Sequence, residues 1–322
     1  MIHTELTMSA RKELVVKQSH ALAISAYGLS RNAKRVLYLA LIEINKAGNS
    51  LEFNHEEGGY EVSVYNDDYI DISGDKQNAR RDILKASREM RKQAVRVYTP
   101  ELDEDGEKAH KERNWLAGFN YEPKNKRTVL VFNSYIVNLI KYKKGDPFTQ
   151  YLLISASRLN SPYSMRLYEL ICQWRSTRHS FKFDLDWLFE RYQLPESYRR
   201  MPDLRRKFLE LTKNEISENT DITITDWKED CLGERKNKVT HVTVYWSEKK
   251  SINKLEADER KKLEQQSDID IAELVTMEES ILATDELDTF SRVLISGYQA
   301  IAKEYDYYTP KNVQSKIKEL IG

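Results

Sequence analysis

The chain has 322 residues, of which 40% are hydrophobic and 32% are charged, and its formal net charge is zero. This length allows two or three domains with their own cores, and the charge content is typical of a soluble surface. No apolar run approaches the roughly 18 residues of a membrane-spanning helix, and the N-terminus lacks the apolar core of a signal peptide, so a cytoplasmic location is expected. Cys172 and Cys231 stand far apart without a Cys-x-x-Cys partner, so neither a zinc site nor a disulfide framework is predicted.

The zero net charge conceals a difference between the two ends of the chain. Residues 251–322 hold 9 Lys and Arg against 15 Asp and Glu, a net charge of −6, and residues 1–250 hold 42 against 36, a net charge of +6. A mildly basic body with an acidic tail is compatible with nucleic-acid binding. An excess of this size decides nothing by itself, so the positions of the basic residues carry the argument.

The first half of the chain shows helical and strand patterns in a definite order. An apolar helix begins after Ser30, a typical cap residue, and is followed by a strand, a short helix, a basic helix and two strands. The two strands are predicted to pair with each other around an acidic insertion at 103–106. The predicted segments, beginning with a disordered lead, are 1–13, 30–47, 60–64, 66–70, 75–92, 95–98 and 129–132.

The second half repeats this order. Its capped helix carries the same Leu-Tyr dipeptide: Leu167 lies seven positions after Asn160, as Leu37 lies seven positions after Ser30. The predicted segments are 161–174, 181–185, 186–192, 203–218, 222–227 and 239–246. Helix, strand, helix, helix and hairpin form the winged-helix order, a variant of the helix-turn-helix.

The sequence therefore predicts an α+β protein with two pseudo-symmetric winged-helix domains and a C-terminal helical tail. The predicted parts are a disordered lead at 1–13, domains at 14–135 and 151–248, a linker at 136–150, and an acidic helical segment at 249–322. Within this segment, charged residues at 252–266, an amphipathic stretch at 285–305 and the Thr309-Pro310 start signal predict helices, the last one reaching Leu320. Two such domains, each with a cationic helix, are suited to two successive grooves of a DNA duplex.

The basic helix of the first domain has two chemically different sides. Helical spacing places one apolar stripe on its buried side: Ala79, Ile83, Ala86 and Met90. The opposite side carries Arg81, Lys85, Arg88 and Lys92, with Gln77 and Asn78 in the first turn. Charges of one sign repel each other and favour an anionic partner over a plain solvated face.

The corresponding helix of the second domain is less one-sided. Its predicted buried stripe is Leu204, Phe208 and Leu211, widened by Leu209 and Ile216. Its outward side mixes cations with Asn214 and Glu210, and taken alone it fits DNA contact and a solvated face equally. The repetition of the pattern favours DNA. The candidate DNA-contacting residues, including those at the tip of the second hairpin, are Arg200, Arg205, Arg206, Lys207, Lys213, Gln77, Asn78, Arg80, Arg81, Lys85, Arg88, Arg235, Lys236 and Lys238. Arginine at such a helix start can read guanine with two hydrogen bonds, and lysines mainly hold phosphates.

Motifs for catalysis are not found in the sequence. A rolling-circle nickase needs a metal-binding His-x-His pair, and the six histidines include none. A Gly-x-x-x-x-Gly-Lys-Ser/Thr phosphate loop is also missing. A binding protein without catalytic residues, metal or cofactor is therefore the simpler interpretation, and a nickase with an unfamiliar active site is an alternative from another class.

Four segments resemble one known family. They are YGLSRNAKRVLY at 27–38, NSPYSMRLYEL at 160–170, WLFERYQLPESY at 187–198 and RMPDLRRKFL at 200–209. These are similar to the replication initiators of iteron-containing, theta-replicating plasmids, most of all those of the F-plasmid type. The resemblance covers residues 14–248.

The resemblance implies a sequence-specific double-stranded DNA-binding protein. Monomers would bind direct repeats (iterons) at a plasmid origin and start replication, and dimers would bind an inverted repeat and repress the initiator's own gene. Arg205, Arg206 and Lys207 would read bases, Arg200 would lie near the backbone, and the helix from Arg80 to Arg88 would mostly hold phosphates. Host initiator, helicase and chaperones are implied partners. The alternative within the same fold is a winged-helix transcriptional regulator without a role in replication.

Overall fold

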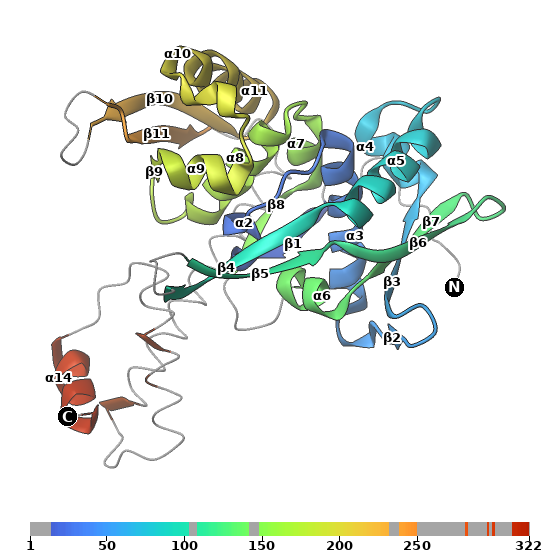
Figure 1. The fold of residues 1–322 in the computed structure, drawn as a ribbon, viewed down its shortest axis with the longest axis horizontal. Coiled ribbons are helices and arrows are strands. Elements are labelled where there is room, and N and C mark those ends of the chain that lie inside the picture. The colour runs from blue at the N-terminus through green and yellow to red at the C-terminus, as the bar shows by residue number, and fades with distance from the viewer. Residues whose placement is uncertain are drawn as a thin grey trace. The chain divides into compact units, whose positions relative to one another are not determined.

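The computed structural model describes residues 14–102, 108–141, 148–231 and 238–249, together with 281–282, 295, 298–299 and 311–321. The chain divides into two compact units, Met1–Asn253 and Lys254–Gly322. The first unit contains both predicted winged-helix domains (Figure 1). Within the described residues, no helix is long and apolar enough to cross a membrane.

The first winged-helix domain has the predicted order of elements. They are α3 (Arg31–Ala47), η1 (Gly48–Ser50), β2 (Phe53–Asn54), β3 (Gly59–Tyr65), α4 (Asn66–Ser73), α5 (Ala79–Lys92), β6 (Leu116–Glu122) and β7 (Arg127–Phe132). The sheet has the antiparallel order β2-β3-β7-β6. Ser30 caps α3 as predicted, because its hydroxyl accepts from the Ala33 backbone N–H.

The second winged-helix domain has the same topology. Its elements are α8 (Pro162–Trp174), β9 (Ser180–Asp184), α9 (Leu185–Tyr192), η2 (Glu196–Arg199), α10 (Met201–Leu204), the π-helical turn η3 (Arg205–Glu210), α11 (Leu211–Asn219), β10 (Ile222–Asp230) and β11 (His241–Glu248). The sheet order β10-β11-β9 matches β6-β7-β3 of the first domain. Two winged-helix domains in an α+β chain are therefore confirmed.

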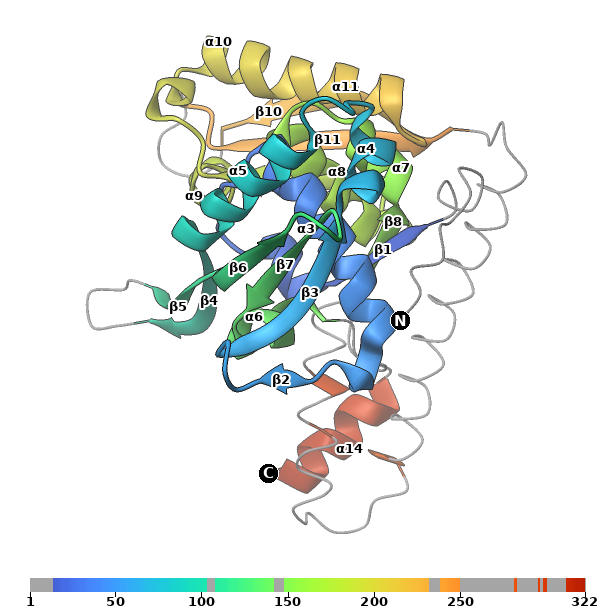
Figure 2. The same ribbon diagram turned by 90° about the vertical axis from the view of Figure 1, so that its right-hand side faces the viewer.

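The strands that precede the first helix of each domain pair with each other. Strand β1 (Val15–Ser19) and helix α2 (His20–Ile24) lead into α3, and β8 (Phe148–Leu152) and α7 (Leu153–Arg158) lead into α8. The antiparallel pairing of β1 with β8 is centred on Lys17 and Gln150 (Figure 2). Two equivalent strands that pair antiparallel are related by a local two-fold axis, so the predicted pseudo-symmetry is built into the backbone.

Two arginines repeat this symmetry in the contact between the domains. Arg35 and Arg166 each lie five residues after the cap of their helix. Arg35 donates to the Ser157 carbonyl at 3.0 and 2.6 Å, at the end of α7. Arg166 donates to the Ser25 and Tyr27 carbonyls at 2.6 and 2.7 Å, between α2 and α3. Each domain thus satisfies backbone acceptors of the other, which would otherwise be buried without partners.

A buried ion pair joins the same two helices. Lys34 on α3 is 0% exposed and Glu169 on α8 is 1% exposed, and the two side chains contact each other. The Tyr38 hydroxyl donates to Glu169 at 2.6 Å, and Lys34 donates to the Tyr27 hydroxyl at 3.0 Å. Burial and the neighbouring Glu169 raise the pKa of Tyr38, which keeps its proton for this bond.

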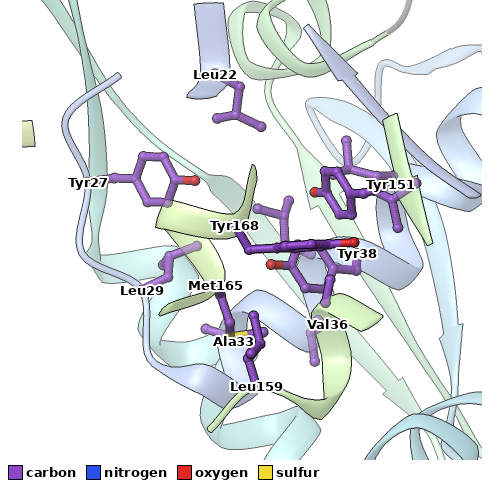
Figure 3. Close-up of a cluster of buried hydrophobic side chains, with 14 of the residues drawn as sticks. Leu22, Tyr27, Leu29, Ala33, Val36, Tyr38, Tyr151, Leu159, Met165 and Tyr168 are labelled. Carbon is purple, nitrogen blue, oxygen red and sulfur yellow. The ribbon is translucent and has the colours of Figure 1, made fainter. Parts of the chain in front are cut away.

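Apolar side chains from both domains surround this polar group. Figure 3 shows Leu29 and Ala33 of the first domain near Leu159 and Met165 of the second, with the rings of Tyr38, Tyr168 and Tyr151 next to this group and Leu22 above them. The Tyr151 ring lies 5.7 Å from Tyr38 and 5.9 Å from Tyr168 between centroids, each in an edge-on arrangement. The hydrophobic core is therefore continuous across the contact between the domains.

The hairpin predicted from residues 95–98 and 129–132 is wrong. Strand β4 (Ala94–Leu102) pairs with β5 (Lys108–Asn114), and β7 pairs with β6 and β3. The β4–β5 hairpin is an addition that the second domain lacks within its described residues. Strand β5 escaped the prediction because its sequence, KAHKERN, has almost no apolar residues and gives no alternating signal.

Two smaller features also differ from the expectation. Ser161, not Asn160, caps α8, so the caps do not stand at equal distances from their Leu-Tyr dipeptides. Asn160 instead accepts a hydrogen bond from Arg31 at 2.8 Å. The stretch 136–150, expected to be a linker, contains most of α6 (Ser134–Ile140) and the start of β8.

The second unit is described in part. Helix α14 (Lys311–Ile321) confirms the last predicted helix, with Val313 and Ile317 buried. The helices predicted at 252–266 and, apart from three residues, at 285–305 lie outside the described residues, as does the lead at 1–13.

Candidate nucleic-acid interface

Helix α5 begins at Ala79 rather than near Asp75, because Asp75 closes the preceding turn. The backbone N–H and side-chain amide of Asn78 donate to the Asp75 carboxylate at 3.0 and 2.8 Å. These bonds lower the pKa of Asp75. Asn78 is the cap residue of the helix, and Gln77 is exposed in the turn before it. Both therefore lie at the positive end of the helix dipole.

The two sides of α5 are those that the sequence predicts. Ala79, Ile83, Ala86 and Met90 are all buried. The exposed basic residues are Arg80, Arg81, Lys85, Arg88, Arg91 and Lys92. A pair of hydrogen bonds from Ser30 to the Glu89 carboxylate, both 2.6 Å, joins α5 to the start of α3.

The exposed cations of α5 are only weakly neutralised. Arg81 lies 3.3 Å from Asp82, with 71% of its side chain exposed. The guanidinium of Arg80 stacks over the Tyr121 ring of β6 at 4.7 Å, which inclines it toward the hairpin. In the part of the chain that the structure describes, Lys85 and Arg88 have no carboxylate within ion-pairing distance. This face has the charge pattern of an anion-binding surface.

The helix of the second domain has a different register from the predicted one. Leu204, Phe208, Thr212 and Ile216 point into the core at intervals of four, while Leu211 is partly exposed. The cause is the π-helical turn η3, which inserts one extra residue per turn. Leu211 as a core residue is thus a wrong prediction, and Thr212 takes its place.

Asp203 gathers three of the predicted cations at the start of this helix. Its carboxylate lies 3.8 Å from Arg200, 3.3 Å from Arg206 and 3.0 Å from Lys207. The hydrogen bond from Lys207 lowers the pKa of Asp203, so this carboxylate stays charged. The side chains of Arg200 and Arg206 remain 80% and 70% exposed, which leaves them accessible to a ligand.

Two further cationic side chains of the helix contact residues of strand β10. Arg205 donates from Nε and Nη2 to the two carboxylate oxygens of Glu229, both at 2.6 Å. Lys213 donates to the Thr225 carbonyl at 2.9 Å and lies 5.3 Å above the Trp227 ring. These two side chains are therefore fixed between helix and hairpin.

Sequence reasoning missed Asp203 and Glu229 as parts of the site. The i,i+3 and i,i+4 spacing from Asp203 to Arg206 and Lys207 was available as a signal. The contact between Arg205 and Glu229 spans 24 positions, and local sequence gives no signal for it.

The hairpin tips are partly described. Arg235 and Lys236 lie outside the described residues, and Lys238 is exposed at the start of the segment that follows. On the first hairpin, Arg127 donates to the Glu122 carboxylate at 2.7 and 2.9 Å and to the Ser63 hydroxyl of β3 at 3.2 Å, so its guanidinium is held against the sheet. The described residues contain no group of three His, Cys, Asp or Glu that could hold a metal ion.

Comparison with known proteins places this arrangement in a family. A family model described as "Initiator Replication protein, WH1" matches residues 15–172, and one described as "Initiator Rep protein, WH2" matches residues 184–246. The chain belongs to the replication initiator family. The resemblance seen in the sequence is thereby confirmed, and this initiator carries the DNA-binding winged helices of that family.

Two individual proteins are similar to this chain. An uncharacterized 27.6 kDa protein of Escherichia coli is 31% identical over 221 residues, which are 65% of this chain and 87% of that protein. The crystal structure of the Pi initiator protein in complex with iteron DNA matches with a TM-score of 0.55 at 20% identity, over 74% of this chain and 99% of that one. This structural similarity shows that the two proteins share a fold.

Proposed function

We propose that this initiator binds double-stranded plasmid origin DNA with two helices, one from each winged-helix domain. The helix α10–η3–α11 would read bases, and α5 would hold phosphates in the adjacent groove. The observation that carries the proposal is the exposed face of α5, where Arg81, Lys85 and Arg88 stand opposite a fully buried apolar stripe and Arg80 lies beside them. A face of one charge sign in the position of a recognition helix favours a polyanion.

The chemistry of the two helices supports a division of labour. The second domain presents arginines at the start of its helix, and arginine suits bidentate recognition of guanine. The first domain presents Lys85 and Arg88 without carboxylate partners among the described residues, which suits phosphates and gives salt-dependent affinity. Arg200, Lys207, Lys213, Gln77 and Asn78 would contribute further backbone contacts, as would the second hairpin tip.

Binding by the full-length protein tests this division directly. The DNA flanking its own gene and a random duplex of equal length are titrated over a salt series. Arg205→Ala/Arg206→Ala should weaken binding to the specific site far more than to the random duplex. Lys85→Ala/Arg88→Ala should weaken both about equally and reduce the salt slope by about 1 for each phosphate that the protein no longer neutralises. Equal, purely salt-driven binding of the wild type to every duplex would refute the proposal.

We further propose that monomers bind direct origin repeats and start replication, and that dimers bind an inverted repeat and repress the initiator's gene. The family membership and the resemblance of residues 27–38 and 160–209 support this. Sedimentation of complexes on direct-repeat and inverted-repeat DNA should give one and two chains per site, respectively. Host initiator, helicase and chaperones are the corresponding proposed partners.

A transcriptional regulator with no role in replication is the competing function for the same fold. A plasmid that carries only this gene and its adjacent repeats separates the two. Such a plasmid should be maintained if the protein is an initiator, and it should disappear from the culture if the protein is only a regulator.

A further inference from the structure

Arg205 and Arg206 are adjacent in sequence but differ in how firmly they are held. Arg205 makes two parallel hydrogen bonds of 2.6 Å to Glu229. Arg206 makes one contact of 3.3 Å to Asp203, and its side chain is 70% exposed. A bidentate contact between guanidinium and carboxylate fixes the plane of the arginine, whereas a single long contact leaves it free to rotate.

The contact with Glu229 occupies only one edge of the Arg205 guanidinium. Nε and one Nη2 hydrogen face the carboxylate, so the Nη1 hydrogens and the second Nη2 hydrogen remain on the outer edge. The Arg205 side chain is 45% exposed, and among the described residues its guanidinium makes no hydrogen bond other than those to Glu229. Two adjacent N–H groups on such an edge match O6 and N7 of guanine in the major groove.

Glu229 is suited to holding this geometry. It lies on β10 opposite Val242 of β11, next to the hairpin tip, and its side chain is only 18% exposed. The hydrogen bonds from Arg205 lower the pKa of Glu229, so the carboxylate is charged at neutral pH. The strand β10 is fixed by its hydrogen-bond ladder with β11. The Glu229 carboxylate therefore holds the Arg205 guanidinium in a set position relative to the helix backbone.

We propose that Glu229 is a positioning residue, which presents the outer edge of Arg205 to a guanine, and that Arg205 rather than Arg206 reads this base. The inference rests on the proposed function and specifies its chemistry. It opposes a second reading of the same contact, in which Glu229 merely competes with DNA for Arg205. Removing a competitor would strengthen binding, whereas removing a positioning group weakens discrimination.

The test measures specificity as the ratio of affinities for the specific site and for sites with each G·C pair replaced in turn. The variants of the full-length chain are Glu229→Gln, Arg205→Ala, Arg206→Ala and the double variant Glu229→Gln/Arg205→Ala. Asp230→Asn is the matched control, because Asp230 is the next residue on β10 and pairs with Lys228 and Lys182 instead of Arg205. It removes one carboxylate charge from the same strand and leaves the contact between Arg205 and Glu229 in place.

We expect Arg205→Ala to lose at least about fivefold discrimination at one G·C pair. Glu229→Gln should lose most of that discrimination at the same pair, Asp230→Asn should keep it, and the double variant should lose no more than Arg205→Ala alone. The inference would be overturned if Glu229→Gln bound the specific site as tightly as the wild type or more tightly, or if Arg206→Ala instead lost discrimination at that pair. In either case, sequence-preferred binding by the wild type would still uphold the proposed function. A wild type without sequence preference would overturn both.

Discussion

At the scale of single residues, the site contains acids as well as the cations that the sequence emphasises. Asp203 and Glu229 hold four basic side chains between them in the protein without DNA. A cationic face without acids would be attracted to any polyanion, whereas these carboxylates offset part of the positive charge, and Glu229 gives Arg205 a defined direction. The acids thus favour selective binding over general attraction.

The titration of Glu229 gives a direct measure of its contact with Arg205. Because this contact lowers the pKa of the folded-state carboxyl, the hydrogen bonds should persist on acidification and break only as the pH falls through that lowered pKa. The Nε–H resonance of Arg205, followed by NMR in the protein without DNA, should change with a midpoint below 4.5, the ordinary Glu value. A midpoint at or above 4.5 would contradict the contact, and Glu229→Gln should abolish the transition.

At the scale of elements, the π-helical turn decides which residues of the helix α10–η3–α11 face the core. An α-helix continued from Phe208 would bury Leu211, and the extra residue of η3 buries Thr212 instead. The Thr212 hydroxyl donates to the Leu209 carbonyl at 3.2 Å, so this polar side chain is satisfied in its buried place. The turn includes Arg205 and Arg206, so it also sets the directions in which these arginines leave the helix.

A pair of lysine substitutions tests this register. Thr212→Lys should lower the free energy of unfolding by at least about 3 kcal/mol, because a charge would be placed in a closed core position. Leu211→Lys should cost about 1 kcal/mol or less, since its side chain can reach solvent. Urea unfolding of both variants measures the difference. The reverse order of stabilities would mean a regular α-helix here.

The extent of sequence-based prediction follows from how local each signal is. The buried stripe of α5, from Ala79 to Met90, repeats at helical spacing and was predictable residue by residue. Strand β5 was not predictable, because its polar sequence lacks the alternating pattern of a strand and it forms only by pairing with β4. Contacts such as that of Arg35 with the Ser157 carbonyl leave no trace in sequence, since a backbone acceptor exists at every residue.

At the scale of the whole first unit, the two domains pack together around one shared core. The core runs across their contact, and the buried Lys34–Glu169 pair lies within it. A buried ion pair adds little net stability compared with apolar residues, yet losing one partner is costly. We therefore expect the pair to favour one orientation of the domains more than it strengthens the fold.

Substitution at this pair should show that asymmetry. Glu169→Gln leaves the Lys34 charge buried without a counter-charge and should lower the free energy of unfolding by about 3–5 kcal/mol. The double variant Lys34→Met/Glu169→Gln removes both charges, and an amide oxygen can still accept from Tyr38, so most of the stability should be recovered. Urea denaturation gives both values. A double variant as unstable as the single one would show that the charges are not coupled.

The pairing of β1 with β8 has a consequence for the way the molecule lies on DNA. A two-fold axis between these strands exchanges the halves, and a protein with identical halves would fit its site equally well when turned end for end. This chain breaks the equivalence, because the β4–β5 hairpin belongs to the first half and the Arg205–Glu229 contact to the second. Under the proposed function, each bound copy therefore has a direction. Copies on successive direct repeats would all point the same way, so that a row of them has a leading and a trailing end.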